Sequence, residues 1–250
     1  MEQNNYSIHR VPPIWIRITH WTLTFSFFAL LFSGFIILMC HPRLYWGEVG
    51  NDLTPAILEF PISRNHQHGG WDQVQAFTTD PDGPYSASRT FEIFNENGWG
   101  RSLHFLAAWI LVTTGLVYLC IGLVSGHLWR RIWPKAADLK PSLLWADFKH
   151  HIRRNFPKKS GWDPYGHLQK WAYWSVIFVL FPVIIMTGLT MSPAVTAAYP
   201  FLLDLFFGAQ SARTIHFFAS SALVLFLLTH LIMVIRSGFR KNLGTITIGK

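Results

Sequence analysis

The most constraining feature of this sequence is its last apolar run, residues 213–236, because two histidines lie inside it. His216 and His230 are 14 positions apart. In an α-helix this spacing is a rise of about 21 Å, and it returns to within ~40° of the starting face. The two imidazoles would therefore lie on nearly one side of a helix at two depths. Because one ion cannot bind groups about 20 Å apart, the spacing predicts two separate cofactor sites; the alternative is a histidine pair hydrogen-bonded within a bundle.

The composition is that of a membrane protein. Half of the 250 residues are hydrophobic and 14% are charged, whereas soluble domains carry about 25% charged residues. The two cysteines, Cys40 and Cys120, form neither a CxxC nor a CxxCH motif, which argues against iron–sulfur clusters, zinc ribbons and covalently attached haem. We expect no disulfide between them, because the predicted topology puts them at different depths.

Four apolar runs are long enough to cross a bilayer, which needs about 20 residues. They are residues 15–39, 101–125, 167–191 and 213–236. The polar N-terminus has no short apolar core with a cleavage site, so we interpret it as an uncleaved start leading into a signal-anchor helix. The sequence therefore predicts an all-α, integral membrane four-helix bundle, formed as a single domain over residues 1–250.

The loops differ in charge, and this difference predicts the orientation. The loop 40–100 holds eight acidic and three basic residues, whereas 127–166 holds nine basic and three acidic residues. Lys and Arg accumulate in cytoplasmic loops. We therefore expect both termini in the cytoplasm, with loop 40–100 and connection 192–212 outside, in the periplasm of a Gram-negative cell. This explains the net charge of +8 better than nucleic-acid binding does, and contact with anionic lipid is a further expectation.

The predicted topology pairs four intramembrane histidines. His20 and His230 fall near the cytoplasmic side, and His104 and His216 fall near the outer side. An iron porphyrin with two imidazole ligands takes one from each face of the ring, and bundle interiors are suited to such cofactors. We therefore predict two b-type haems, one held by His20 and His230 and the other by His104 and His216.

A local repeat supports this pairing. An arginine stands three positions before three of these histidines, and on a helix such a pair shares one face. The pairs are Arg17 with His20, Arg101 with His104, and Arg213 with His216. Each guanidinium would reach the carboxylate propionates of a haem bound by its histidine. The alternative is that each arginine only extends to the membrane interface.

Some small and bent positions are open to two interpretations. Gly34, Gly115 and Gly188 lie within the spans, where they could let a flat macrocycle approach the backbone or could serve close helix packing. Pro182 should bend the third span.

The chain resembles the bacterial dihaem cytochrome b-561 superfamily in three features. It has four spans, one histidine in each of the first two spans, and a histidine pair 14 positions apart in the fourth. That group includes the cytochrome b subunits of nickel-iron hydrogenase, formate dehydrogenase and thiosulfate reductase. The cytochrome b of quinol–cytochrome c complexes also has histidines 14 apart, but on two helices, and here Tyr118 stands 14 positions after His104. The long acidic loop and the segments YGHLQKWAYW, GLTMSP and FGAQSARTIHF look most like the thiosulfate reductase group.

The resemblance implies a multi-pass protein of the bacterial inner membrane that transfers electrons between quinone and a periplasmic partner, such as a molybdenum oxidoreductase. Candidate quinone contacts near the inner haem are Arg17, Tyr165, His167, Gln169 and Lys170, and the outer loop with Trp71 and Trp99 is the expected docking surface. Two other functions remain open: a stand-alone quinone-linked redox enzyme, and a transporter that uses the histidines as a proton relay without haem.

Overall fold

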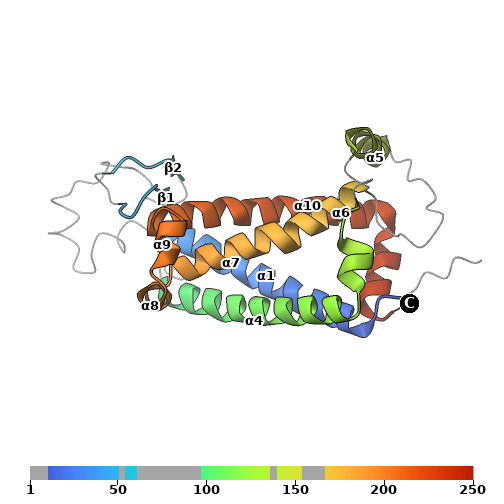
Figure 1. Cartoon of the computed structure of the whole chain (residues 1–250), viewed down its shortest axis with the longest axis horizontal. Helices are drawn as coiled ribbons and strands as arrows, with labels where there is room; N and C mark the ends of the chain where they lie inside the picture. Colours follow the sequence, from blue (N-terminus) through green and yellow to red (C-terminus); the bar gives the residue numbers. More distant parts are fainter. Residues whose placement is uncertain (1–10, 51–53, 61–96, 136–139, 154–166, 250) are drawn as a thin grey trace, which may run out of the picture.

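The computed structural model describes residues 11–50, 54–60, 97–135, 140–153 and 167–249, and these residues fold mainly as long helices that run side by side (Figure 1). Four of the helical stretches are long and apolar enough to cross a membrane: Ile14–Met39, Gly98–Val124, Leu168–Thr190 and Ala209–Thr247. Each overlaps one of the four predicted spans. The predicted class, an all-α membrane bundle of four spanning helices, is confirmed.

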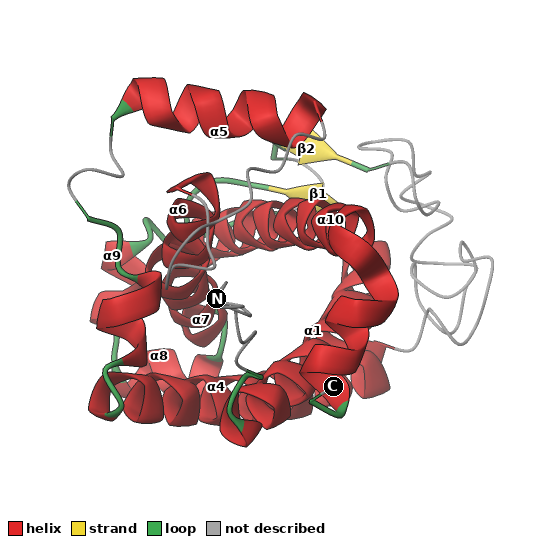
Figure 2. Cartoon of the chain, turned by 90° about the vertical axis from the view of Figure 1, so that its right-hand side faces the viewer, coloured by secondary structure: helices red, strands yellow, loops and turns green. Residues whose placement is uncertain are grey.

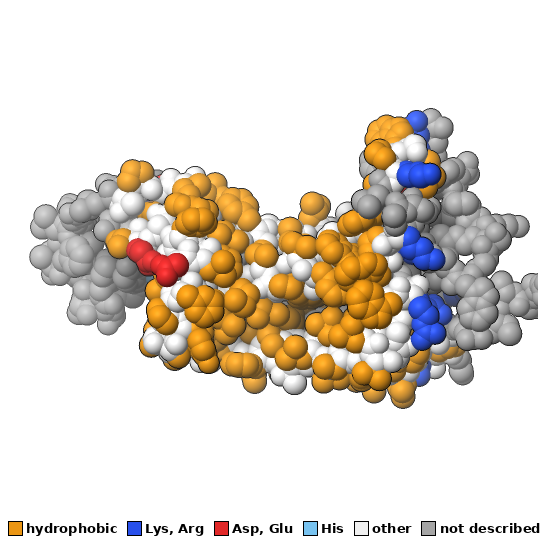
Figure 3. Space-filling view, viewed as in Figure 1, with side chains coloured by type: hydrophobic (Ala, Val, Ile, Leu, Met, Phe, Trp, Pro, Cys, Tyr) orange, Lys and Arg blue, Asp and Glu red, His pale blue; other side chains and the backbone are white. Residues whose placement is uncertain are grey.

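The bundle is built from two helix pairs. Helix α1 (Ile14–Cys40) packs along α4 (Asn97–Val124), and α7 (Phe181–Thr190) packs along α10 (Ala209–Thr247). Seen from one end, these helices surround a common axis (Figure 2). Phe25, Trp109 and Leu225 are each more than 60% exposed, and apolar side chains cover most of the visible face (Figure 3). So large an apolar surface is expected where lipid, and not water, surrounds the protein.

The third span is interrupted where its proline predicts a disturbance. It consists of α6 (His167–Ser175), the π-helical segment η4 (Val176–Leu180) and α7. Pro182 stands at the start of α7 and has no N–H for the preceding turn. The wider π turn before it accommodates the missing hydrogen bond, so the expected bend takes the form of a local change in helix type.

The fourth helix continues beyond its predicted end at residue 236. Gly238 breaks the helix with φ 115° and ψ 83°, and helical structure then resumes as far as Thr247. The Asn242 side chain donates a 3.1 Å hydrogen bond to the Val234 carbonyl, which faces the break. The segment after Gly238 turns across the end of the bundle (Figure 1). The sequence missed this helix because a basic, glycine-containing tail carries no apolar run.

Short elements also occur in the segments expected to be loops. The basic loop contains the π-helical η2 (Leu128–Ile132) and the helix α5 (Pro141–Arg153), the outer connection contains α8 (Pro193–Ala198) and α9 (Phe201–Leu205), and the acidic loop contains β1 (Arg43–Leu44) paired antiparallel with β2 (Leu58–Glu59). Proline at the first position of α5 and of α8 is the usual helix-start signal, and the sequence prediction did not use it.

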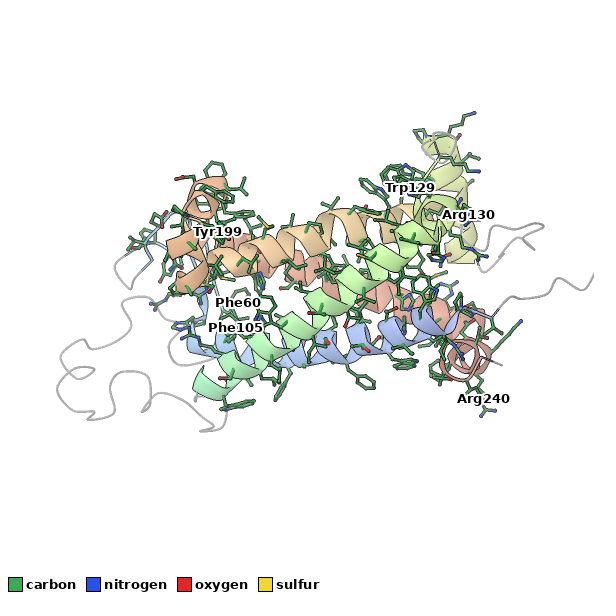
Figure 4. The ribbon with its side chains drawn as sticks, turned by 60° about the horizontal axis from the view of Figure 1, so that its bottom comes forward. Phe60, Phe105, Trp129, Arg130, Tyr199 and Arg240 are labelled. Carbon is green, nitrogen blue, oxygen red and sulfur yellow. The ribbon has the colours of Figure 1, made fainter. Side chains whose placement is uncertain are left out.

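The two ends of the bundle differ in charge. Lys and Arg side chains gather at the end that carries α5, and acidic side chains are visible at the opposite end (Figure 3). We call these the basic end, with Arg130 and Arg240, and the acidic end, with Glu48 and Asp204. Figure 4 shows Arg130 and Arg240 opposite Tyr199. Both the start of α1 and the C-terminal end of α10 lie at the basic end (Figure 1).

At the acidic end, the segment after α1 holds the start of α10. The backbone N–H of Gly47 donates to Ser211 Oγ at 2.6 Å, and the hydroxyl of Thr214 donates to the Tyr45 carbonyl at 2.6 Å. Gly208 precedes the helix with φ +107°, and a Cβ there would lie 2.5 Å from the Gly47 backbone. This close contact requires glycine. It also fixes the depth of the first turns of α10 relative to α1.

Candidate functional site

Two of the predicted histidines face each other at the acidic end. His104 is the eighth residue of α4, and His216 is the eighth residue of α10. Their ring centroids lie 6.3 Å apart and their planes are inclined by 56°. Helices α4 and α10 both begin at the acidic end (Figure 1), so these two residues meet although they are 112 positions apart.

The separation of these rings fits one metal ion between them. A metal–imidazole bond is about 2.0–2.1 Å long and a ring nitrogen lies about 1.1 Å from its ring centre, so two coaxial imidazoles on one ion have centroids about 6.2–6.4 Å apart. The centroids of His104 and His216 are 6.3 Å apart, which falls in that range. The donor set is two neutral imidazoles from different helices, which is a set that haem iron accepts. The residues present therefore fit the predicted haem.

Each of these histidines contacts a buried hydroxyl. Ser33 Oγ of α1 lies 3.0 Å from His104 Nδ1, and Thr187 Oγ1 of α7 lies 3.0 Å from His216 Nδ1. Both hydroxyl residues are fully buried. The sequence analysis missed both residues. The signal that could have found them is a repeated Ser/Thr-Gly pair, at positions 33–34 and 187–188.

The glycine of each pair lies beside the same imidazole. A Cβ added to Gly34 would lie 3.5 Å from His104 Cε1, and one added to Gly188 would lie 3.5 Å from His216 Cε1. At Gly115 an added Cβ would meet nothing within 4 Å. Two of the three predicted glycines therefore leave room next to the candidate ligands, and the third does not border them.

The other predicted pair is less closely held. His20 of α1 and His230 of α10 lie near the basic end. His20 Nδ1 is buried and has no hydrogen-bond partner within the described part of the chain. The ring of His230 stacks on Phe226, with centroids 6.0 Å apart and planes inclined by 20°. A buried imidazole nitrogen without a partner is the kind of group that a cofactor or water would satisfy.

The three predicted arginines differ in their surroundings. Arg17 Nη1 donates to the Thr247 carbonyl at 3.3 Å, while its buried Nε has no partner among the described residues. Arg213 Nη2 donates to the His41 carbonyl at 2.7 Å. Arg101 is exposed. Their interaction with haem propionates stays a prediction.

A third histidine lies in an aromatic cluster at the basic end, outside the spans. The ring of His127 is 5.6 Å from that of Trp15, centroid to centroid, and 6.4 Å from that of Tyr118. Burial lowers the pKa of His127, and the charges of Arg131 and Arg130 lower it further. His127 is therefore held neutral near pH 7.

The predicted quinone and docking residues are only partly described. Tyr165 and Trp71 lie outside the described residues. Gln169 Nε2 donates to the Tyr173 hydroxyl at 2.9 Å, and Lys170 is buried. The ring of Trp99 packs on Phe32 at 6.0 Å. His167 begins α6. Cys120 is an exposed free thiol.

An apolar helical bundle that opposes two imidazoles at a metal-binding separation has the architecture of a membrane cytochrome b. Residues 11–247 match the family described as prokaryotic cytochrome b561, and the chain belongs to this family. It is 30% identical over 243 residues to the "Putative protein-methionine-sulfoxide reductase subunit YedZ1" of Azospira oryzae, covering 94% of this chain and 93% of that protein. No solved structure matches the chain significantly.

Family and fold together establish the coarse function. The predicted cytochrome b superfamily is confirmed. The chain is a multi-pass bacterial membrane protein, and membership in a family that binds haem b supports a role in electron transfer.

Proposed function

We propose that this chain is the dihaem cytochrome b subunit of an oxidoreductase complex in the bacterial inner membrane, formed as one membrane domain over residues 1–250. It would transfer electrons between the membrane quinone pool and a periplasmic redox partner. The observation that carries this proposal is the opposition of His104 and His216, with ring centroids 6.3 Å apart inside an apolar bundle.

In this proposal, His104 and His216 hold the outer haem, and His20 and His230 hold the inner haem. Each haem supplies one-electron redox chemistry, while the protein fixes its position and adjusts its potential through ligands, hydrogen bonds and burial. Arg101 and Arg213 at the acidic end, and Arg17 at the basic end, lie on the same helices as the histidines and supply cations for the propionates.

The charges of the two ends support the proposed orientation. Lys and Arg gather at the basic end, which also carries the start of α1 and the C-terminal end of α10 (Figures 1 and 3). Since basic residues mark the cytoplasmic side, we place both termini in the cytoplasm and the acidic end in the periplasm. The inner haem then lies on the cytoplasmic side of the membrane. Quinone would exchange electrons near Arg17, Gln169 and Lys170.

The relative supports a partner protein. By its name, the protein of Azospira oryzae is a subunit of a putative protein-methionine-sulfoxide reductase. We propose that this chain likewise serves a periplasmic oxidoreductase, molybdenum-dependent and similar to thiosulfate reductase. A partner would dock at the acidic end, on the side of the outer haem.

The experiment that tests this function is the haem content of the purified protein. The chain is expressed with adequate haem supply, purified in detergent, and assayed by pyridine haemochrome against amino-acid analysis. We expect two b-type haems per chain, and reduction of both by a quinol analogue in membranes. Protein without haem would refute the electron-transfer function and favour the proton relay.

A further inference from the structure

The environment of the outer histidine pair repeats on both sides of the site. On one side α1 supplies Ser33 and Gly34 to His104 of α4; on the other, α7 supplies Thr187 and Gly188 to His216 of α10. The two hydroxyl–imidazole distances are both 3.0 Å. Two unrelated helix pairs thus present the same contact to the same nitrogen of each ring, which indicates a role beyond packing.

The direction of these hydrogen bonds follows from the other partners. The hydroxyl of Ser33 donates to the Ala29 carbonyl at 2.7 Å, and that of Thr187 donates to the Val183 carbonyl at 2.7 Å. Each hydroxyl has one proton, so its oxygen is left to accept from the imidazole.

The protonated nitrogen of each ring follows from this direction, because the hydroxyl oxygen can only accept from Nδ1. In both histidines Nδ1 therefore carries the proton and Nε2 keeps its lone pair.

We propose that Ser33 and Thr187 are the positioning residues of the outer haem site. By accepting hydrogen bonds from Nδ1–H of His104 and His216, they fix the tautomer that leaves both Nε2 atoms free for iron. They also hold the two imidazole planes at their mutual angle of 56°. This inference rests on the proposed function. It assigns to Ser33 and Thr187 the orientation of the ligands of the outer haem only.

The inner pair lacks this arrangement, which makes the inference specific. His20 Nδ1 has no hydrogen-bond partner in the described residues. An acceptor on Nδ1–H raises the basicity of a ligating imidazole, so it stabilises the oxidised iron. Loss of either hydroxyl should therefore raise the midpoint potential of the outer haem and leave that of the inner haem unchanged.

The test uses the full-length, haem-loaded protein with the variants Ser33→Ala and Thr187→Val, the second of which keeps the shape of threonine. Matched controls are Ser26→Ala and Thr190→Val. Ser26 and Thr190 are also buried, and each donates at 2.8 Å to the carbonyl four residues before it. Neither forms a hydrogen bond to a histidine among the described residues. Thr187→Ser is the rescue variant.

Potentiometric titration and the low-spin ferric EPR signal are the readouts, and the outer haem is identified as the component that His216→Ala removes. We expect the outer component alone to titrate at a higher potential, with a changed largest g value, because each ring can then rotate. We also expect haem retention at that site to weaken by about 10-fold or more. Thr187→Ser should restore all three.

Three results would overturn the inference: unchanged potentials, equal shifts in both haems, or equal effects in the two controls. Wild-type protein is measured first, so its lack of haem would overturn the proposed function, and this inference with it. Two haems in wild-type protein, with no selective change in the variants, would overturn the inference alone.

Discussion

Replacing His104 or His216 with alanine is expected to remove the same one of two haems. The two rings oppose each other with centroids 6.3 Å apart, so they would share one iron. His230 lies about 21 Å further along α10 by helical rise and cannot replace His216. Each single variant should therefore lower the content of low-spin haem from two per chain to one.

Double variants measure the pairing directly. His104→Ala combined with His216→Ala should lose no more haem than either change alone, because both residues would serve one site. His216→Ala combined with His230→Ala should lose both haems. The effects of two changes at one shared site should not add, whereas the effects of changes at two distant sites should add.

The assay is pyridine haemochrome per chain, combined with a potentiometric titration that resolves the two components. His127→Ala is the control, because His127 packs among aromatic rings outside the spans and should keep both haems. If His104→Ala and His216→Ala removed different components, or if the pair of changes removed both haems, the proposed pairing would be refuted.

Three further predictions concern other residues. Gly188→Leu should lower the haem content to one per chain, because its side chain would fill the space beside His216 Cε1. Gly115→Leu should retain both haems, because a Cβ added at Gly115 would meet nothing within 4 Å. Gly208→Ala should destabilise the protein by roughly 1–3 kcal/mol or more, measured by thermal unfolding in detergent, because of its positive φ and the Gly47 backbone. Burial and nearby arginines lower the pKa of His127 in the folded protein. Its contribution to stability is therefore complete above pH 6.5, the usual pKa of histidine, and is lost as the pH falls. Between pH 7 and pH 5, the unfolding temperature should fall less in His127→Gln than in wild-type protein.

Much of the architecture was predictable from local pattern. Apolar runs of membrane-crossing length identified all four spanning helices, because lipid requires such runs wherever a helix crosses. The spacing of His216 and His230 gave two depths from helical geometry alone. The predicted end of the fourth span, residue 236, was two positions short of the break at Gly238. The helix beyond Gly238 was not predicted, because it carries no apolar run.

The sequence by itself determined that this protein lies in lipid, where its four spans run, and how deep each intramembrane histidine lies in its span. These properties depend on residue type and on the period of a single helix. Only the tertiary structure decided that Ser33 and Thr187 meet His104 and His216, and that the two rings lie 6.3 Å apart. Such contacts depend on the rotation and depth of one helix against another. Those are set by packing along the pairs α1–α4 and α7–α10 and by the loop that holds the start of α10, and no single segment encodes them.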